Sequence, residues 1–452
     1  MRNRRQILRG RSAWALLILV AALLAAPPLG AAAPAPPARL RALIVDGQSN
    51  HGWQETTAAL QATLLDTGRF TVDVSTAPPE GASPAQWASW QPAFANYDVV
   101  LTDYKGQMWP ESVRLSLESY ISGGGGLVII HAPLATFVTP NLLPGEQEWA
   151  AYSQWMALGW RPIIFGTRVT VDDVTNDLNF FPPFTGGSSV HGIQHSFVVK
   201  SRRPAHPIMA GLPLEWLHGK DELYHSMRGP ALNMNVLASA FSAVSTGGTG
   251  EHEPMLWETP YGLGRIVTTV MGHRWFGSGY GPPGSVSENG PDALNCVGFQ
   301  TLIARSAEWA AGAGVSVPVP DAFPSSNVAS VRDPLRGTWL RLGLKINGQH
   351  PANDLVMTPG PFALTLDMAP GLWAEPLDLY FAAIVGSQLV WITAGGLSAT
   401  PGPVSRLTPL SLEAVPLIDG QLTPGTVITV LMLFVEGNRA ITYDLISGIV
   451  PP

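Results

Sequence analysis

The chain has 452 residues, of which 46% are hydrophobic and 13% charged, which predicts a globular protein of two or three domains and excludes a disordered chain. The formal charge is −7, and without the five arginines at the N-terminus the remainder carries about −12. This acidic balance argues against nucleic acid or an anionic membrane surface as a partner. Cys296 is the only cysteine, so an intrachain disulfide and a Cys-x-x-Cys zinc site are excluded.

The first 33 residues resemble an export signal. Arginines precede an apolar run of 13 residues from Trp14 to Ala26, and small residues follow from Gly30 to Ala33. This run is shorter than the about 18 residues that span a bilayer, so a permanent anchor is the weaker alternative. The pair Arg4-Arg5 leaves open a twin-arginine signal. We therefore expect a periplasmic or secreted protein that loses residues 1–33 and keeps no stable membrane span.

Residues 40–130 alternate between apolar runs and amphipathic stretches. Strands are predicted at 40–46, 70–74, 97–102 and 126–130, and helices at 56–67 and 111–122. In the second helix Val113, Leu117 and Ile121 recur at helical spacing. Because strands that alternate with helices form parallel sheets covered on both faces, this segment predicts an α/β domain with a mostly parallel sheet.

The alternation of predicted strands and helices weakens after residue 140, and the pattern changes again after residue 312. Residues 141–195 are predicted as long loops with short helices. Strands at 197–200, 236–238 and 265–270 and a helix at 293–311 then complete an α/β domain of residues 40–312. Residues 313–327, with several prolines, are predicted as a linker. Short apolar strands between Pro/Gly turns in residues 328–452 predict an all-β sandwich, an accessory or attachment domain.

Polar residues stand at the ends of several predicted strands of the α/β domain. Ligands of an open parallel sheet bind beyond the carboxyl ends of its strands, so these residues are the first site candidates. Asp46 to His51 follow the first strand, Asp103 to Lys105 the third, and His131 the fourth. Imidazoles can act as general bases near neutral pH. For each single histidine, a hydrogen bond to the backbone is the structural alternative.

Several short motifs occur in an order that resembles the ThuA-like, or trehalose-utilisation, family. They are Asn50-His51-Gly52-Trp53, Tyr97-Asp98-Val99-Val100, the segment 124–132 (GGGLVIIHA), His206-Pro207-Ile208, Asp221-Glu222-Leu223-Tyr224, Pro254 with Trp257, Tyr261-Gly262-Leu263-Gly264-Arg265, and Gly272-His273. The resemblance covers about residues 40–312. It implies a fold like that of class I glutamine amidotransferases, a flavodoxin-like three-layer sandwich, and a link to trehalose, other disaccharides and 3-keto sugars.

One position departs from the amidotransferases. Where they carry a nucleophilic cysteine after a strand, this chain carries His131, as ThuA-like proteins do. An imidazole cannot replace a thiolate in forming a thioester, and Cys296 lies in the predicted last helix of the domain, as a small buried residue. Glutamine hydrolysis is therefore disfavoured.

The motifs supply candidate site residues. We expect His131 or His273 to move a proton, with Glu222 as orienting group or partner acid. On a strand, the adjacent Asp221 would face away from Glu222, so only one of the two would enter the site. The candidate substrate-binding residues, chosen for hydrogen bonding or stacking, are Asp46, Asn50, His51, Trp53, Tyr104, Asp221, Tyr224 and Trp257. His206 and His225 complete the histidine-rich set.

No sequence motif predicts a cofactor, and none is expected. A divalent metal held by two or three of these histidines and Glu222 is chemically allowed, although no residues have the spacing of a metal motif. The aspartates in residues 172–177 lack the glycine and terminal glutamate of a calcium loop. The glycine run at 123–126 precedes a strand, whereas a phosphate loop precedes a helix.

Tryptophans in the predicted loops favour a carbohydrate ligand, because aromatic faces stack on sugar rings; filling of the core is the alternative. The expected function is an exported protein acting on a sugar or keto-glycoside by His/Glu acid–base chemistry. The second hypothesis is a non-catalytic carbohydrate-binding or scaffold protein. A small-molecule sugar is the expected partner, and the C-terminal domain would attach the protein to a polysaccharide or cell surface.

Overall fold

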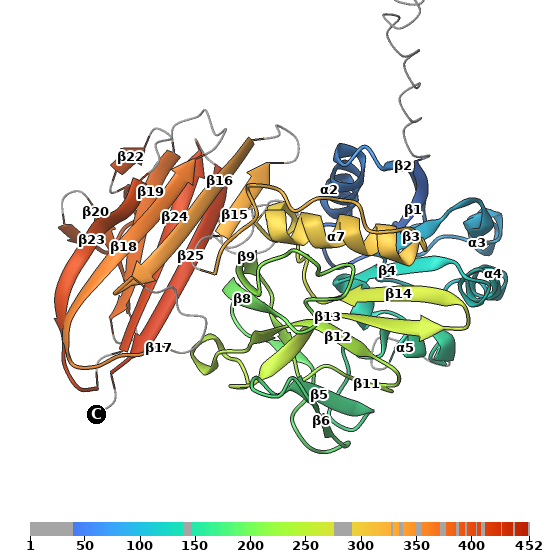
Figure 1. Cartoon of the computed structure of the whole chain (residues 1–452), viewed down its shortest axis with the longest axis horizontal. Coiled ribbons are helices and arrows are strands. Elements are labelled where there is room, and N and C mark those ends of the chain that lie inside the picture. Colours follow the sequence, from blue (N-terminus) through green and yellow to red (C-terminus); the bar gives the residue numbers. More distant parts are fainter. Residues whose placement is uncertain are drawn as a thin grey trace, which may run out of the picture. The chain divides into compact units, whose positions relative to one another are not determined.

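A computed structural model of the chain describes residues 39–138, 147–274 and 292–326 (Figure 1). Further along it describes residues 329–333, 338–348, 355–370, 377–385, 388–393, 396–403, 405–407, 412–425, 427–436 and 439–450. The predicted leader, residues 1–33, lies outside the described residues. Within the described part of the chain, no helix has the length and apolar character needed to cross a membrane.

Five parallel strands form one end of the largest sheet. In spatial order they are β2 (Phe70–Thr76), β1 (Leu40–Asp46), β3 (Val99–Thr102), β4 (Gly126–Ile130) and β14 (Gly264–Thr269). Every residue of β3 and β4 is buried, as continuous apolar runs in a sheet covered on both faces require. The predicted α/β fold with a mostly parallel central sheet is confirmed.

Helices cover both faces of these strands. On one face α2 (Trp53–Asp66) contacts α7 (Val297–Ala310), and α7 also contacts β4 and β14. The other helices are α3 (Pro84–Ser89), α4 (Glu111–Ser122), α5 (Ala150–Met156) and α6 (Asp292–Asn295), with 3-10 turns η1 (Phe94–Asn96), η2 (Ala132–Ala135) and η3 (Val244–Thr246). In α4 the residues Val113, Leu117 and Ile121 are buried, as their spacing predicts.

The sheet continues beyond β14 in antiparallel strands. The next strands are β13 (His252–Tyr261), β12 (Asn235–Phe241), β8 (His195–Ser201) and β9 (Glu215–Asp221). Shorter strands beside them are β5 (Thr167–Val171), β6 (Leu178–Phe181), β7 (Val190–His191), β10 (Tyr224–His225) and β11 (Arg228–Gly229). Part of the segment predicted as loops therefore pairs as strands, notably the β5–β6 hairpin. It lacks a long apolar run, which is why its strands were not predicted.

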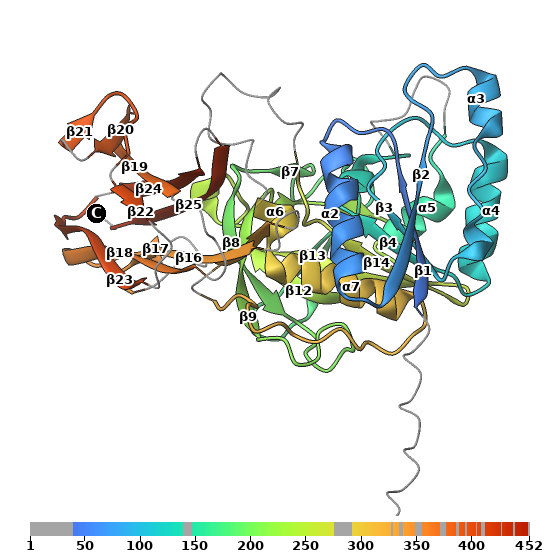
Figure 2. The same ribbon diagram turned by 90° about the horizontal axis from the view of Figure 1, so that it is seen from above.

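The residues after 328 form only strands in the described ranges (Figures 1 and 2). One sheet contains β15 (Ala329–Asp333), β16 (Thr338–Ile346), β18 (Gly360–Pro370) and β23 (Leu412–Leu422). The other contains β17 (Leu355–Val356), β25 (Arg439–Ile449), β24 (Val427–Glu436), β19 (Leu377–Val385), β20 (Gln388–Thr393), β21 (Gly396–Ser398) and β22 (Ser405–Leu407). The predicted all-β character of this region is confirmed, and the domain boundaries stay a prediction.

Candidate functional site

Three histidines and one glutamate meet at the carboxyl end of the parallel strands. His51 follows β1, His131 follows β4 and His273 lies a few residues after β14. These strands are parallel, so their carboxyl ends lie at the same edge of the sheet. Glu222 follows β9 and completes the group, and all four residues are buried.

Asp221 joins the end of β9 to the segment after β14. Its carboxylate accepts hydrogen bonds from the backbone N–H of Gly272 at 2.8 Å and of His273 at 3.1 Å. His218 Nε2 contacts the same carboxylate at 2.8 Å. Asp221 therefore faces the backbone, whereas Glu222 enters the site, so the two adjacent carboxylates separate as their alternation predicts.

His131 has an unusual backbone conformation, with φ 59° and ψ −99°. A non-glycine residue in this region stores strain that the surroundings must hold, and such residues concentrate at functional sites. Here the backbone N–H donates to Thr269 O at 2.9 Å, and the ring Nδ1 contacts Val270 O at 2.6 Å. Because the carbonyl can only accept, Nδ1 carries the proton and Nε2 keeps a lone pair that faces the site.

The imidazole rings form a nearly equilateral group. The ring centroids of His51 and His131, and of His51 and His273, are 5.0 Å apart, and those of His131 and His273 are 5.3 Å apart. The angles between the ring planes are 90°, 83° and 73°. Glu222 lies between two of them, with carboxylate oxygens 3.7 Å from His131 Nε2 and 3.2 Å from His273 Nε2.

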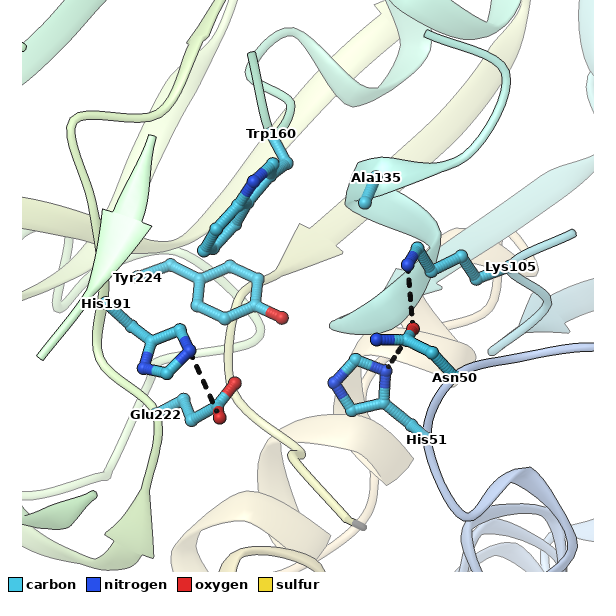
Figure 3. Close-up of a pocket in the computed structure, with 8 residues that line it drawn as sticks. All are labelled: Asn50, His51, Lys105, Ala135, Trp160, His191, Glu222 and Tyr224. Atoms are coloured by element: carbon cyan, nitrogen blue, oxygen red, sulfur yellow. Dashed lines mark hydrogen bonds and ion pairs between the residues drawn. The ribbon is translucent and has the colours of Figure 1, made fainter. Parts of the chain in front are cut away.

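A cavity of about 190 Å³ opens beside this cluster (Figure 3). Its lining residues are Asn50, His51, Lys105, Ala135, Trp160, His191, Glu222 and Tyr224. Figure 3 shows Trp160, Tyr224, His191 and Glu222 on one side and Asn50, His51 and Lys105 on the other. The cavity thus has one wall with two aromatic rings and an opposite wall with an amide, an imidazole and an ammonium group.

Hydrogen bonds fix the polar groups on both walls. Lys105 Nζ donates to Asn50 Oδ1 at 2.7 Å, and His51 Nδ1 lies 2.9 Å from the same oxygen. Across the cavity the Tyr224 hydroxyl lies 2.9 Å from His131 Nε2, to which it can donate, and His191 Nε2 lies 3.3 Å from Glu222 Oε1. The side chains are held in place before any ligand enters.

Burial determines the charge state of the cluster. It lowers the pKa of His131 to about 4 and the pKa values of His51 and His273 well below their ordinary range. Burial, and then the negative charge of Asp221, raises the pKa of Glu222 to about 8. At neutral pH the three imidazoles are therefore neutral and present nitrogen lone pairs.

Five of the predicted substrate-binding residues, including the Asp221 described above, lie outside the cavity lining. Asp46 is buried and accepts a hydrogen bond from Thr57 Oγ1 at 2.7 Å. Tyr104 is buried, and its hydroxyl donates to the carbonyl of Gln107. Trp257 was expected in a loop, but it is fully buried in β13, where its indole N–H donates to the Met156 carbonyl. Trp53 is the first residue of α2.

Other histidines of the predicted set lie elsewhere. His206 Nε2 is 3.2 Å from Glu258, and the His206 ring lies near Trp309. His225 Nδ1 contacts Ser226 Oγ at 3.4 Å, and neither histidine lines the cavity. Cys296 is buried at the start of α7 and accepts a hydrogen bond from the Gly219 N–H, whereas His131 follows β4.

Sequence reasoning did not single out His191, and it raised Lys105 and Trp160 only within wider groups, the polar residues after the third predicted strand and the tryptophans of the predicted loops. His191 belongs to a two-residue strand, and Trp160 follows a segment without periodicity, so no strand-end signal precedes either. Lys105 does follow a predicted strand, and its position three residues after Thr102 was the available signal. Together they supply the cavity wall that the motifs alone did not.

These features define an α/β protein with a histidine-rich pocket at the carboxyl edge of its parallel strands. Residues 41–277 match the ThuA family, described as trehalose utilisation. This match spans more than half of the chain, and the chain belongs to the ThuA family. The predicted family is confirmed.

Two solved structures of ThuA-like proteins match part of the chain. A ThuA-like protein of Parabacteroides merdae is 34% identical, with a TM-score of 0.57, over 66% of this chain and 99% of that one. A ThuA-like protein of Bacteroides uniformis is 17% identical, with a TM-score of 0.37, over 62% of this chain and 94% of that one. No curated protein matches the chain.

Proposed function

We propose that this ThuA-family protein acts on a small sugar or keto-glycoside in the described pocket, by proton transfer at its imidazole and carboxylate groups. One observation carries the proposal: His131, His273 and Glu222 converge beside a cavity, lined in part by Glu222, that has aromatic and hydrogen-bonding walls. The family description, trehalose utilisation, supports a sugar as the substrate class.

The walls suit a sugar ring. Trp160 and Tyr224 lie with ring centroids 4.8 Å apart at 70°, so they present an aromatic corner on which the C–H face of a sugar can lie. Asn50 and Lys105 on the opposite wall supply polar groups for hydroxyls. An apolar face opposed by a few fixed polar groups is the arrangement that orients a small polar ligand.

The cluster suits proton transfer at a keto sugar. A hydrogen on the carbon next to a carbonyl, or on a hydroxyl, is removed by a base positioned within hydrogen-bond reach. His131 and His273 are the bases in this proposal, and Glu222, within 3.7 Å of both, returns the proton or orients the rings. We further propose that the protein is exported and that the β-rich C-terminal region attaches it to a polysaccharide or cell surface.

A second candidate is a sugar-binding protein without turnover. The Tyr224 hydroxyl already occupies the lone pair of His131 Nε2, so the cluster could serve only to hold a ligand. The two candidates share the pocket and differ in whether a bound sugar is consumed.

The test is binding and product analysis with trehalose, glucosides and their 3-keto forms, on wild type, His131→Ala and the control His206→Gln, whose imidazole pairs with Glu258 elsewhere. We expect wild type and the control to bind and convert one of these sugars. We expect His131→Ala to bind it and to lose about 100-fold or more of the turnover. Binding without conversion by wild type supports the second candidate, and no binding of any sugar contradicts both.

A further inference from the structure

The three imidazoles of the pocket have the mutual arrangement of ligands on one ion. In a tetrahedral site with metal–nitrogen distances of about 2.0–2.1 Å, three bound imidazole rings have centroids about 5 Å apart. The observed separations are 5.0, 5.0 and 5.3 Å.

We propose that His51, His131, His273 and Glu222 bind one divalent transition-metal ion, with zinc as the reference ion. One ligand atom from each lies within 4.8 Å of the others, and all four residues are buried. Three nitrogen ligands and one carboxylate favour Zn²⁺, Fe²⁺, Co²⁺ or Ni²⁺ over Mg²⁺ and Ca²⁺, which prefer oxygen. This metal site rests on the proposed function in one respect only, the reaction in which the bound ion would take part.

Neighbouring groups orient the rings as groups around metal ligands do. His131 Nδ1 donates to Val270 O, and His51 Nδ1 lies 2.9 Å from Asn50 Oδ1, so in both rings Nε2 is the atom with a lone pair. At His273, by contrast, the Gln194 amide donates from Nε2 to ring Nδ1 at 3.2 Å and to Glu222 Oε1 at 3.4 Å, so binding of an ion through His273 Nε2 requires the ring proton to leave that atom. A hydrogen bond to the second ring nitrogen that fixes tautomer and orientation is the usual companion of a metal-bound histidine.

Binding of an ion requires small movements of these side chains. Ligand atoms in a tetrahedral site are about 3.3 Å apart, so the widest pair must approach by about 1.5 Å, shared between two side chains. The Tyr224 hydroxyl must also leave His131 Nε2, which it contacts at 2.9 Å. Without an ion, the cluster is a hydrogen-bonded group that meets the sugar directly, and the experiment below separates these alternatives.

An ion at this position redefines the roles of the pocket residues. Bound there, it would supply Lewis-acid polarisation of a substrate oxygen. His191 and Tyr224, which are not in the ligand set, then remain as the groups able to exchange a proton beside it. A hydroxy-ketone, with two adjacent oxygens, is the substrate class that fits an ion next to such groups.

The experiment is metal binding to the purified full chain after treatment with a chelator. Zn²⁺ and Co²⁺ are titrated by calorimetry, and the visible absorption of bound Co²⁺ reports its ligands. We expect one ion per chain, and at least 100-fold weaker binding in Glu222→Gln and His273→Asn. We expect His206→Gln to match wild type. Absence of stoichiometric binding to wild type, or equal binding in Glu222→Gln, His273→Asn and wild type, overturns the proposal.

Sugar conversion is measured in parallel on chelated and reloaded protein. Conversion that needs the ion supports both proposals. Conversion by fully chelated protein without a bound ion leaves the proposed function standing and overturns the role of the ion in it, while the titration above decides the metal site itself. Stoichiometric ion binding with no sugar bound or converted supports the metal site and contradicts the proposed function. Because the wild-type titration needs no variant, a substitution that fails to fold does not obscure the result.

Discussion

Two clusters of buried polar side chains lie in the α/β region, one around Arg168 and one around Glu222. Arg168 of β5 contacts the carboxylates of Glu251 and Glu253, and Glu253 also accepts hydrogen bonds from Thr249 and from the Ser226 N–H. In this cluster a permanent positive charge meets carboxylates. Around Glu222, by contrast, the contacting groups are an amide and three imidazoles, two of which burial holds neutral.

The difference separates a structural cluster from a functional one. A buried guanidinium paired with carboxylates fixes the strands that carry it, and losing one partner leaves an uncompensated buried charge. Neutral imidazoles around a carboxyl group carry no opposite charge, so they do not form stabilising ion pairs of this kind. Such a cluster costs stability and is retained where it binds or transforms something.

The largest effect should come from the Glu222 cluster and should appear in function. We expect His273→Ala to reduce conversion of the sugar substrate by about 100- to 10,000-fold, because it removes a group that acts on the reacting atoms. The melting temperature should stay at or above that of wild type. Turnover assays and thermal denaturation check these two expectations. A His273→Ala variant that is active but unstable would indicate that the Glu222 cluster is structural and not functional.

The Arg168 cluster should show the opposite behaviour. We expect Arg168→Met to lower the free energy of unfolding by about 3–5 kcal/mol, because Glu253 is left buried without its partner. Urea denaturation measures this loss. Lys200→Met is the matched control, since its partner Asp173 is exposed and such a pair is worth about 1 kcal/mol or less. A loss in Arg168→Met no larger than in this control would contradict the structural role.

The pH dependence of stability should isolate Glu222 in metal-free protein. Burial raises its pKa to about 8, above the ordinary value of 4.5, so between these two pH values the folded state holds a proton that the unfolded state has released. Stability from this group is therefore complete below the unfolded pKa and is lost as the pH rises through 8. Between pH 6 and 8 wild type should lose about 2 kcal/mol more than Glu222→Gln. The free energies of unfolding are measured by urea denaturation. If they change equally with pH in wild type and Glu222→Gln, the raised pKa of Glu222 is excluded.

The smallest effect should come from the cavity wall. We expect Trp160→Ala to weaken sugar binding by about 5- to 10-fold through the loss of aromatic contact, while the cluster and its chemistry remain. Calorimetric titration of the sugar checks this, with Trp257→Phe as a control because Trp257 is buried in β13 and does not line the cavity. An equal loss in both variants would indicate a general effect on folding.

The sequence predicted the cluster better than the pocket around it. His51 and His131 follow apolar strands of a parallel sheet, and that topology dictates that they share an edge. Glu222 was expected from a motif, but its approach to β14 depends on four intervening antiparallel strand pairings. No local pattern encodes such a long-range contact, so the metal-like arrangement could not be predicted from spacing.

Aromatic residues were the least predictable. Trp257 and Tyr104 were expected to bind substrate, yet Trp257 is buried in a strand, and Tyr104 packs against Trp109 and Phe137. Trp160, with the same chemistry, lines the cavity. Residue type alone does not distinguish an aromatic ring that fills the core from one that faces a ligand, because both bury apolar surface.

The ligand atoms of the pocket come from residues more than 200 positions apart, from His51 to His273. Contacts of such high sequence separation form only when nearly all of the α/β region has adopted its topology. Assembly of the pocket therefore requires both ends of the α/β region, and no fragment that lacks either end can contain it. A ligand that binds only to the folded pocket stabilises the folded state of the whole α/β region. The reason is that the pocket exists only when β1, β4, β9 and β14 are assembled.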